Sequence, residues 1–122
     1  MKKLFLTMCL TALLSGTAIA ACEGGTEYTV DGDTFCISSI GLNWWSASNW
    51  CKANGMRLAT IYEVCPDWNG NANSGKCGRT FFSGDYVFTA TASESGDAFC
   101  VHSSGTIGRG SREYSYPALC TN

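Results

Sequence analysis

Few residues in this 122-residue chain carry side chains that could act in proton transfer or nucleophilic attack. His102 is the single histidine, and it is followed directly by Ser103 and Ser104. A serine nucleophile needs a positioned base, and in many hydrolases it stands in a Gly-x-Ser-x-Gly turn, which this sequence lacks. We therefore expect no enzyme, and a small hydrolase only if His102 and a carboxylate converge in one pocket.

The side chains that could bind a metal or act as paired acids are also few. Scattered along the chain are the carboxylates Glu63, Asp67, Asp85, Glu94 and Asp97, and their spacing predicts no catalytic pair. A single histidine, together with cysteines that are expected to be oxidised, does not favour zinc. The sequence therefore predicts neither a metal site nor a cofactor.

An Asn-rich segment is the best candidate for ligand binding. Residues 67–75 alternate oxygen-bearing side chains with others, but one Asp and three Asn would make a weak, nearly uncharged calcium site. A polar loop is the simpler interpretation, because Asn and Gly tolerate left-handed backbone. Its Trp68 either stacks on a ligand or covers the core, and both interpretations remain open. We predict Trp68, Asn69, Asn71 and Asn73 as ligand-binding residues.

The N-terminal segment and the cysteines indicate export. Lys2 and Lys3 precede a mostly apolar run that is too short to span a bilayer, and residues 18–20 form a small-x-small cleavage site. Residues 1–20 are therefore predicted to be a secretory signal peptide of bacterial type, and residues 21–122 a single mature domain. Export would place that domain in the periplasm, at the cell surface or in the medium, where disulfides form.

A second interpretation of the cleavage boundary stays open. Residues 19–22 resemble a lipobox, in which Cys22 would carry a lipid and anchor the protein. One of the eight cysteines, Cys9, lies in the leader, so the other seven cannot all pair with one another. If Cys22 carries lipid, the remaining six could form three disulfides.

Charge limits the partners that the mature domain could bind. After loss of the two leader lysines, six of the eight basic residues remain against ten acidic ones, a net charge of about −4. A mildly acidic domain does not suit nucleic acid, since phosphate binding needs clustered Lys and Arg. No further apolar stretch is long enough to span a membrane. We expect a protein or glycan ligand, and the sequence does not indicate an oligomeric state.

Two helices are predicted near the middle of the chain. Residues 43–54 have an amphipathic pattern that begins with Asn43, a good N-cap, and stops at Gly55. Residues 61–65 follow a capping-box pattern that starts at Thr60, and a proline directly after them ends the helix.

The rest of the mature chain predicts strands and turns. Residues 22–34 are polar and glycine-rich, and we expect them to lead into a strand over residues 35–39. Further short strands are expected over residues 81–82, 86–91, 98–102 and 114–120. Helices followed by strands predict an α+β fold with an antiparallel sheet.

The helical segment is similar to the first helix of C-type lectin-like domains, where the pattern W-x-x-A-x-x-x-C-x-x-x-G-x-x-L-A recurs. The residues that match it here are Trp44, Ala47, Cys51, Gly55, Leu58 and Ala59. The later segments that resemble strands of the family are Phe88-Thr89, Cys100-Val101 and Ala118-Leu119-Cys120. The resemblance covers about residues 35–120, and it implies two helices, small antiparallel sheets and a Cys51–Cys120 disulfide.

The cysteine pattern departs from that family. Members have a second disulfide between the Cys-Val strand and a cysteine shortly before the last one, but this chain has no cysteine between Cys100 and Cys120. Cys100 then stays unpaired or pairs elsewhere, and elimination leaves Cys36 as its candidate partner. Cys65 and Cys77 are additional to the family pattern, and we expect them to close a local loop.

The family's calcium and sugar motifs are also missing. Sugar-binding members use Glu-Pro-Asn or Gln-Pro-Asp together with Trp-Asn-Asp, and none of these occurs here. The resemblance therefore implies a non-catalytic module that recognises a protein or glycan without calcium, through loops in residues 66–80, 92–97 and 104–113. The alternative is a structural, pilus-associated or lipid-anchored subunit of the cell envelope.

Overall fold

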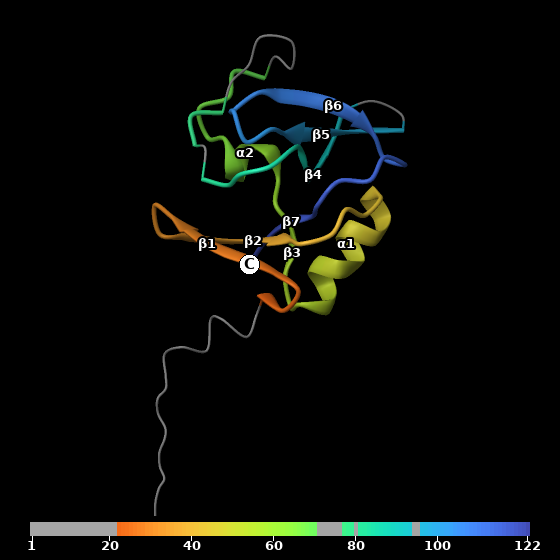
Figure 1. The fold of residues 1–122 in the computed structure, drawn as a ribbon. Coiled ribbons are helices and arrows are strands. Elements are labelled where there is room, and N and C mark those ends of the chain that lie inside the picture. Colours follow the sequence, from red (N-terminus) through yellow and green to blue (C-terminus); the bar gives the residue numbers. More distant parts are fainter. Residues whose placement is uncertain (1–21, 71–76, 80, 94–95) are drawn as a thin grey trace, which may run out of the picture.

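The computed structural model describes residues 22–70, 77–79, 81–93 and 96–122. Figure 1 shows two small antiparallel sheets, one above the other, with one helix along their side and a shorter helix beside the upper sheet. The predicted α+β class is confirmed. In chain order the elements are β1 (Gly25–Val30), β2 (Asp33–Ser38), α1 (Trp44–Ala53), β3 (Arg57–Leu58), α2 (Ile61–Val64), β4 (Val87–Ala92), β5 (Asp97–Val101), β6 (Ile107–Ser111) and β7 (Leu119–Thr121).

The lower sheet brings the two ends of the described chain together. Its strand order is β1-β2-β7-β3, so the last strand lies between two early ones, with Cys120 opposite both Cys36 and Leu58. The upper sheet has the order β4-β5-β6. Between the two sheets lies the larger apolar cluster, which includes Phe35, Ile61, Val64, Val101, Ile107 and Leu119.

The N-terminal hairpin differs from the prediction, because residues 25–30 form strand β1 instead of an irregular leader. Asp31 and Gly32 have positive φ angles of 52° and 87°, which is the backbone of a two-residue hairpin turn. The turn signal was visible in the sequence, but the preceding strand was obscured by its polar residues. Tyr28 and Val30 pack against the core and carry the strand's apolar face.

Helix α1 has the predicted limits. The side chain of Asn43 accepts a hydrogen bond from the Ser46 amide at 2.9 Å, and Gly55 after the helix has a φ of 74°. Trp50 covers the start of β1, where a Cβ on Gly25 would lie 2.9 Å from its ring and 2.4 Å from a backbone oxygen. Glycine is therefore required at that position for the helix to pack on the sheet.

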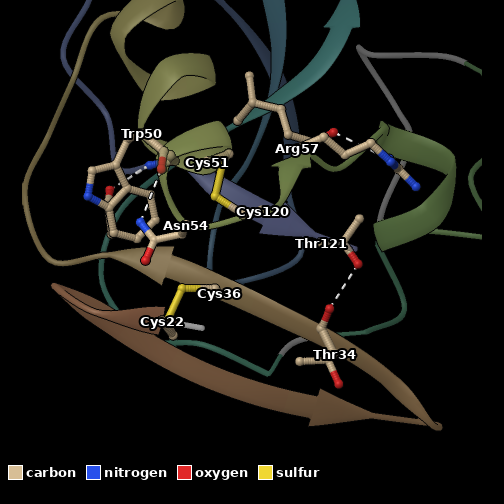
Figure 2. Close-up of a disulfide and its surroundings, with 12 residues drawn as sticks. Cys22, Thr34, Cys36, Trp50, Cys51, Asn54, Arg57, Cys120 and Thr121 are labelled. Atoms are coloured by element: carbon tan, nitrogen blue, oxygen red, sulfur yellow. Dashed lines mark hydrogen bonds between the residues drawn. A yellow bond between two sulfur atoms is a disulfide. The ribbon is translucent and has the colours of Figure 1, made fainter. Parts of the chain in front are cut away.

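The described part of the chain contains three disulfides, and two of them were expected from the sequence. Cys51–Cys120 joins α1 to β7 across a sequence separation of 69, and Cys65–Cys77 closes the loop after α2 across a separation of 12. Figure 2 shows the first of these pairs beneath α1. The longer one ties the helix to the terminal strand and so fixes the lower sheet against α1.

The third disulfide corrects two predictions. Cys22 is bonded to Cys36 (Figure 2), so the expected Cys36–Cys100 pair is wrong. Cys36 and Cys100 lie in different sheets. One sulfur cannot hold both a disulfide and a thioether-linked lipid, so this structure does not agree with a lipidated Cys22. Cys100 is unpaired and buried, and burial, together with the charge of Asp97, raises the pKa of its thiol to about 12. The thiol is therefore protonated at neutral pH and is a poor nucleophile.

Candidate functional site

An open groove of about 440 Å³ lies between the β1–β2 hairpin and α2. Its lining is mostly polar and comes from four parts of the chain: the hairpin, α2 with the proline after it, the loop after the second cysteine of the Cys65–Cys77 pair, and the end of β7. The lining residues are Gly32, Asp33, Thr34, Phe35, Tyr62, Glu63, Pro66, Arg79, Thr121 and Asn122.

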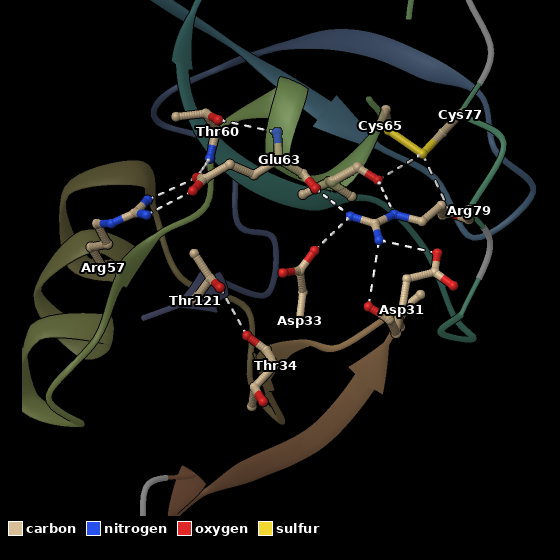
Figure 3. A network of polar contacts seen from close by, with 12 residues as sticks. Asp31, Asp33, Thr34, Arg57, Thr60, Glu63, Cys65, Cys77, Arg79 and Thr121 are labelled. Carbon is tan, nitrogen blue, oxygen red and sulfur yellow. Dashed lines mark hydrogen bonds and ion pairs between the residues drawn. A yellow bond between two sulfur atoms is a disulfide. The ribbon is translucent and has the colours of Figure 1, made fainter. Parts of the chain in front are cut away.

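Arg79 holds the two walls of the groove together. Its side chain is 13% exposed, and Figure 3 shows the guanidinium between α2 and the hairpin. Nε donates to the carbonyl of Val64 at 3.1 Å, and Nη2 donates to the carbonyl of Glu63. These carbonyls lie at the end of α2, where the helix cannot provide partners of its own. Across the groove, Nη1 donates to the carbonyl of Val30 at 3.5 Å.

The same guanidinium also faces two carboxylates of the hairpin. Asp31 lies 3.4 Å from Nη1 and Asp33 lies 3.5 Å from Nη2, while the ring of Phe35 is 5.6 Å from the central carbon. A guanidinium has five N–H donors, and each of these is directed to an acceptor of the protein. Arg79 therefore acts as a structural clamp and not as a ligand for anions.

Glu63 forms part of the groove wall at the first turn of α2. Its carboxylate accepts two hydrogen bonds from Arg57, at 2.8 and 2.7 Å, and one from the Thr60 amide at 2.8 Å. Thr60 in turn accepts from the Glu63 amide, which completes the predicted capping box. The hydrogen bonds from Arg57 are the main reason that the pKa of Glu63 falls to about 2. Glu63 thus stays ionised at neutral pH and cannot serve as a general acid there.

This low pKa gives the stability a pH dependence. Because the pKa is about 2 in the folded state, below its ordinary value of 4.5, the contribution of Glu63 is complete above about pH 4.5 and is lost as the pH falls toward 2. The side chain is 37% exposed, so solvent limits the contribution to about 1 kcal/mol. We expect Glu63→Gln to lower the free energy of unfolding at pH 7, with a difference that shrinks below pH 4.5. Urea denaturation of both proteins across this pH range tests the prediction. A difference in the free energy of unfolding that does not change with pH would contradict it.

The rim of the groove carries an exposed aromatic side chain, Tyr62, which is 55% exposed. Ile61 and Val64 face the core, so the ring of Tyr62, which lies between them in the sequence, points outward from α2. Behind it lies Trp68, with ring centroids 5.3 Å apart, and Trp68 itself rests edge-on against Phe99 at 4.9 Å. Tyr62 is thus an aromatic platform supported by the buried ring of Trp68 and, behind it, the partly buried ring of Phe99.

Trp68 therefore has a different place from the one predicted. It is only 7% exposed and belongs to the core, so the interpretation as a ligand-stacking residue is wrong and the core-covering one holds. The cause is the turn after α2, where the Trp68 amide donates to the Cys65 carbonyl at 3.0 Å and directs the ring inward. Asn69 is exposed, while Asn71 and Asn73 lie outside the described residues.

Sequence reasoning did not single out Tyr62 and Arg79 as site residues, nor the hairpin residues of the groove, Asp33 and Thr34. Tyr62 could have been found, because a helix with Ile61 and Val64 inward leaves it outward. Arg79 could not, because its partners on the hairpin are 46 to 49 residues away in the sequence. Of the loops that were expected to bind ligand, the one that spans residues 66–80 is the only one whose described residues line the groove.

His102 and a carboxylate do approach each other, but away from the groove. Nε2 of His102 lies 3.7 Å from Asp85, and Nδ1 lies 2.9 Å from the hydroxyl oxygen of Ser104. Nδ1 also accepts the backbone N–H of Ser104 at 3.0 Å, so its lone pair is already used by the turn. The arrangement orders this turn on the surface, and none of its members lines the groove.

Two further observations concern metal ions and membranes. Among the described residues there is no group of three or more His, Cys, Asp or Glu side chains that could hold a metal ion. No helix in that part of the chain is long and apolar enough to cross a membrane.

A scan against protein-family models and a search of curated proteins find no match for this chain. The fold and the groove themselves define the class of protein: a small disulfide-bonded α+β protein with a polar groove and an aromatic rim.

Proposed function

We propose that this protein is an exported, non-catalytic binding module with a C-type lectin-like fold, and that it recognises a glycan or protein ligand in the groove. The order of elements supports the fold: an early strand, two helices, a small sheet and a terminal strand that returns beside the first sheet. The Cys51–Cys120 bond from α1 to that terminal strand is the one that the resemblance implies.

The observation that carries the function is the groove with Tyr62 on its rim. An exposed ring that packs against the buried Trp68 loses little conformational entropy on binding, and its face can stack on the C–H face of a sugar. Polar groups that line the same groove, such as Asp33 and Thr34, can orient hydroxyl groups. This combination favours a glycan over an apolar small molecule.

Calcium has no part in the proposed recognition. The groove carboxylate Glu63 is already bound by Arg57, and Asp33 faces Arg79. That leaves Asp33 as the one side-chain carboxylate of the groove, among the described residues, with oxygens open to a ligand, which is too few for a cation that needs six to eight oxygen ligands. The missing calcium motifs of the resembled family agree with this proposal.

The three disulfides support an oxidising, exported environment. We infer that the module works in the periplasm or at the cell surface.

A glycan array tests the function. Wild-type protein with EDTA is expected to bind a restricted set of glycans, and Tyr62→Ala is expected to lose at least about tenfold in affinity, because a stacking aromatic is a binding hot spot. Tyr114→Ala is the matched control, since Tyr114 is equally exposed at 54% but does not line the groove. Binding that needs calcium, or that the control lowers as much as Tyr62→Ala, would contradict the proposal.

One observation favours a second candidate, a structural subunit of the envelope. Among the described residues, three of the four large apolar side chains that are exposed lie on two adjacent segments. They are Ile40, Trp45 and Tyr114. The segments are joined by backbone hydrogen bonds, such as the one from the Leu42 amide to the Tyr116 carbonyl at 2.8 Å. If no glycan binds, light scattering of wild type and Trp45→Ser would show whether this surface drives assembly.

A further inference from the structure

Among the described residues, the one cation that lines the groove is already paired within the protein, whereas carboxylate oxygens stay open to a ligand. All five N–H groups of Arg79 are directed to Val30, Glu63, Val64 and the two hairpin carboxylates. Arg57, the other cation nearby, uses both terminal nitrogens on Glu63. Arg57 does not line the groove, so among the described lining residues a ligand anion finds no guanidinium with spare donors.

The hairpin carboxylates, by contrast, remain accessible. Asp33 lines the groove with a side chain that is 60% exposed, and the neighbouring Asp31 side chain is 79% exposed. Their contacts with Arg79 are long, at 3.4 and 3.5 Å, so they are weak hydrogen bonds that leave oxygen lone pairs for a ligand. A donor in the groove can reach Asp33 without breaking the clamp on the α2 carbonyls.

The net negative charge of the chain also favours a cationic ligand. With the predicted leader removed, six basic residues stand against ten acidic ones, which would raise the local concentration of a cationic ligand. Tyr62 adds a ring face that attracts both C–H groups and a nearby ammonium.

We propose that the groove binds an amino sugar with an unsubstituted, protonated amine, its ring face on Tyr62 and its ammonium group at Asp33. This inference rests on the proposed function, since it names the ligand class of the same groove. A volume of about 440 Å³ with an open mouth accommodates one or two pyranose rings of a longer chain. N-acetylation removes the charge and adds bulk at the same position, so it weakens binding.

Calorimetric titration with two chitin-derived oligomers tests the inference. One is the glucosamine oligomer and the other is the N-acetylglucosamine oligomer of equal length. At low salt, wild type is expected to bind the glucosamine oligomer at least about fivefold more tightly, and added salt is expected to reduce this preference. Asp33→Asn is expected to reduce affinity for the glucosamine oligomer by about twofold to fivefold, the effect of one exposed ion pair. Glu113→Gln, an exposed acid that does not line the groove, is the control and is expected to change nothing.

The outcomes separate this inference from the proposed function. Equal binding of both oligomers, or unchanged affinity in a folded Asp33→Asn, would overturn the ammonium contact but leave the groove as a glycan site. Binding of a lysine-rich peptide without binding of the amino sugar would overturn the ligand class. Loss of all glycan binding on the array would overturn the proposed function as well.

Discussion

Removal of the Cys51–Cys120 disulfide is expected to lower the free energy of unfolding by about 4 kcal/mol. The bond closes a loop with a sequence separation of 69, and the chain-entropy relation assigns about 4 kcal/mol to a loop of that size. Stabilities of small domains are about 5–15 kcal/mol, so this is a large share. The double variant Cys51→Ala/Cys120→Ala avoids a second unpaired thiol besides Cys100, and urea denaturation under oxidising conditions measures the change.

The Cys65–Cys77 bond provides the matched comparison. Its sequence separation is 12, for which the same relation gives about 3 kcal/mol. We expect Cys65→Ala/Cys77→Ala to be less destabilised and to retain the packing of α1. If the two double variants unfold at the same urea concentration, the long loop is not the main source of the stabilisation.

Replacement of Arg79 by leucine is expected to cost about 3 kcal/mol and to abolish binding in the groove. Leucine removes the donors to the carbonyls of Val64 and Glu63, and a buried acceptor that loses its partner costs about 1–3 kcal/mol. The link to the Val30 carbonyl is lost as well, so the hairpin is no longer tied to α2. The hairpin and α2, which form the two walls of the groove, would then no longer be held at a fixed distance from each other.

Arg57→Leu is the control for this prediction. Arg57 is 51% exposed and pairs only with Glu63 and its own neighbour's carbonyl, so its removal is expected to cost about 1 kcal/mol or less. Denaturation by urea and glycan affinity would be measured for both variants. Equal stability losses for the two arginines would show that the Arg79 contacts do not act as a clamp.

The parts of the fold that depend on local sequence were predictable. The limits of α1 follow from Asn43 and Gly55, and α2 follows from its Thr60 capping box, because caps act within one helical turn. The Cys51–Cys120 pair came from a resemblance in the helical pattern. Each of these features is encoded by residues that are close in sequence or that match a known pattern.

The parts that depend on distant contacts were not predictable in the same way. Cys36 pairs with Cys22 because β1 runs antiparallel beside β2 and brings the N-terminal segment next to it. The number of cysteines alone does not indicate this pairing. Trp68 turns inward because Phe99 and other core residues take its ring. The groove is the strongest example, since Arg79 and its partners on the hairpin are 46 to 49 residues apart in the sequence and meet only in the tertiary structure.

The most direct test of the central claim is a nuclear magnetic resonance titration of the uniformly ¹⁵N-labelled protein with a glycan selected on the array. If the groove is the binding site, the largest amide shift changes occur at Asp33, Tyr62 and Arg79, with little change in α1. If the largest changes lie instead around Trp45 and Tyr114, the ligand binds that other aromatic surface and the groove is not the recognition site.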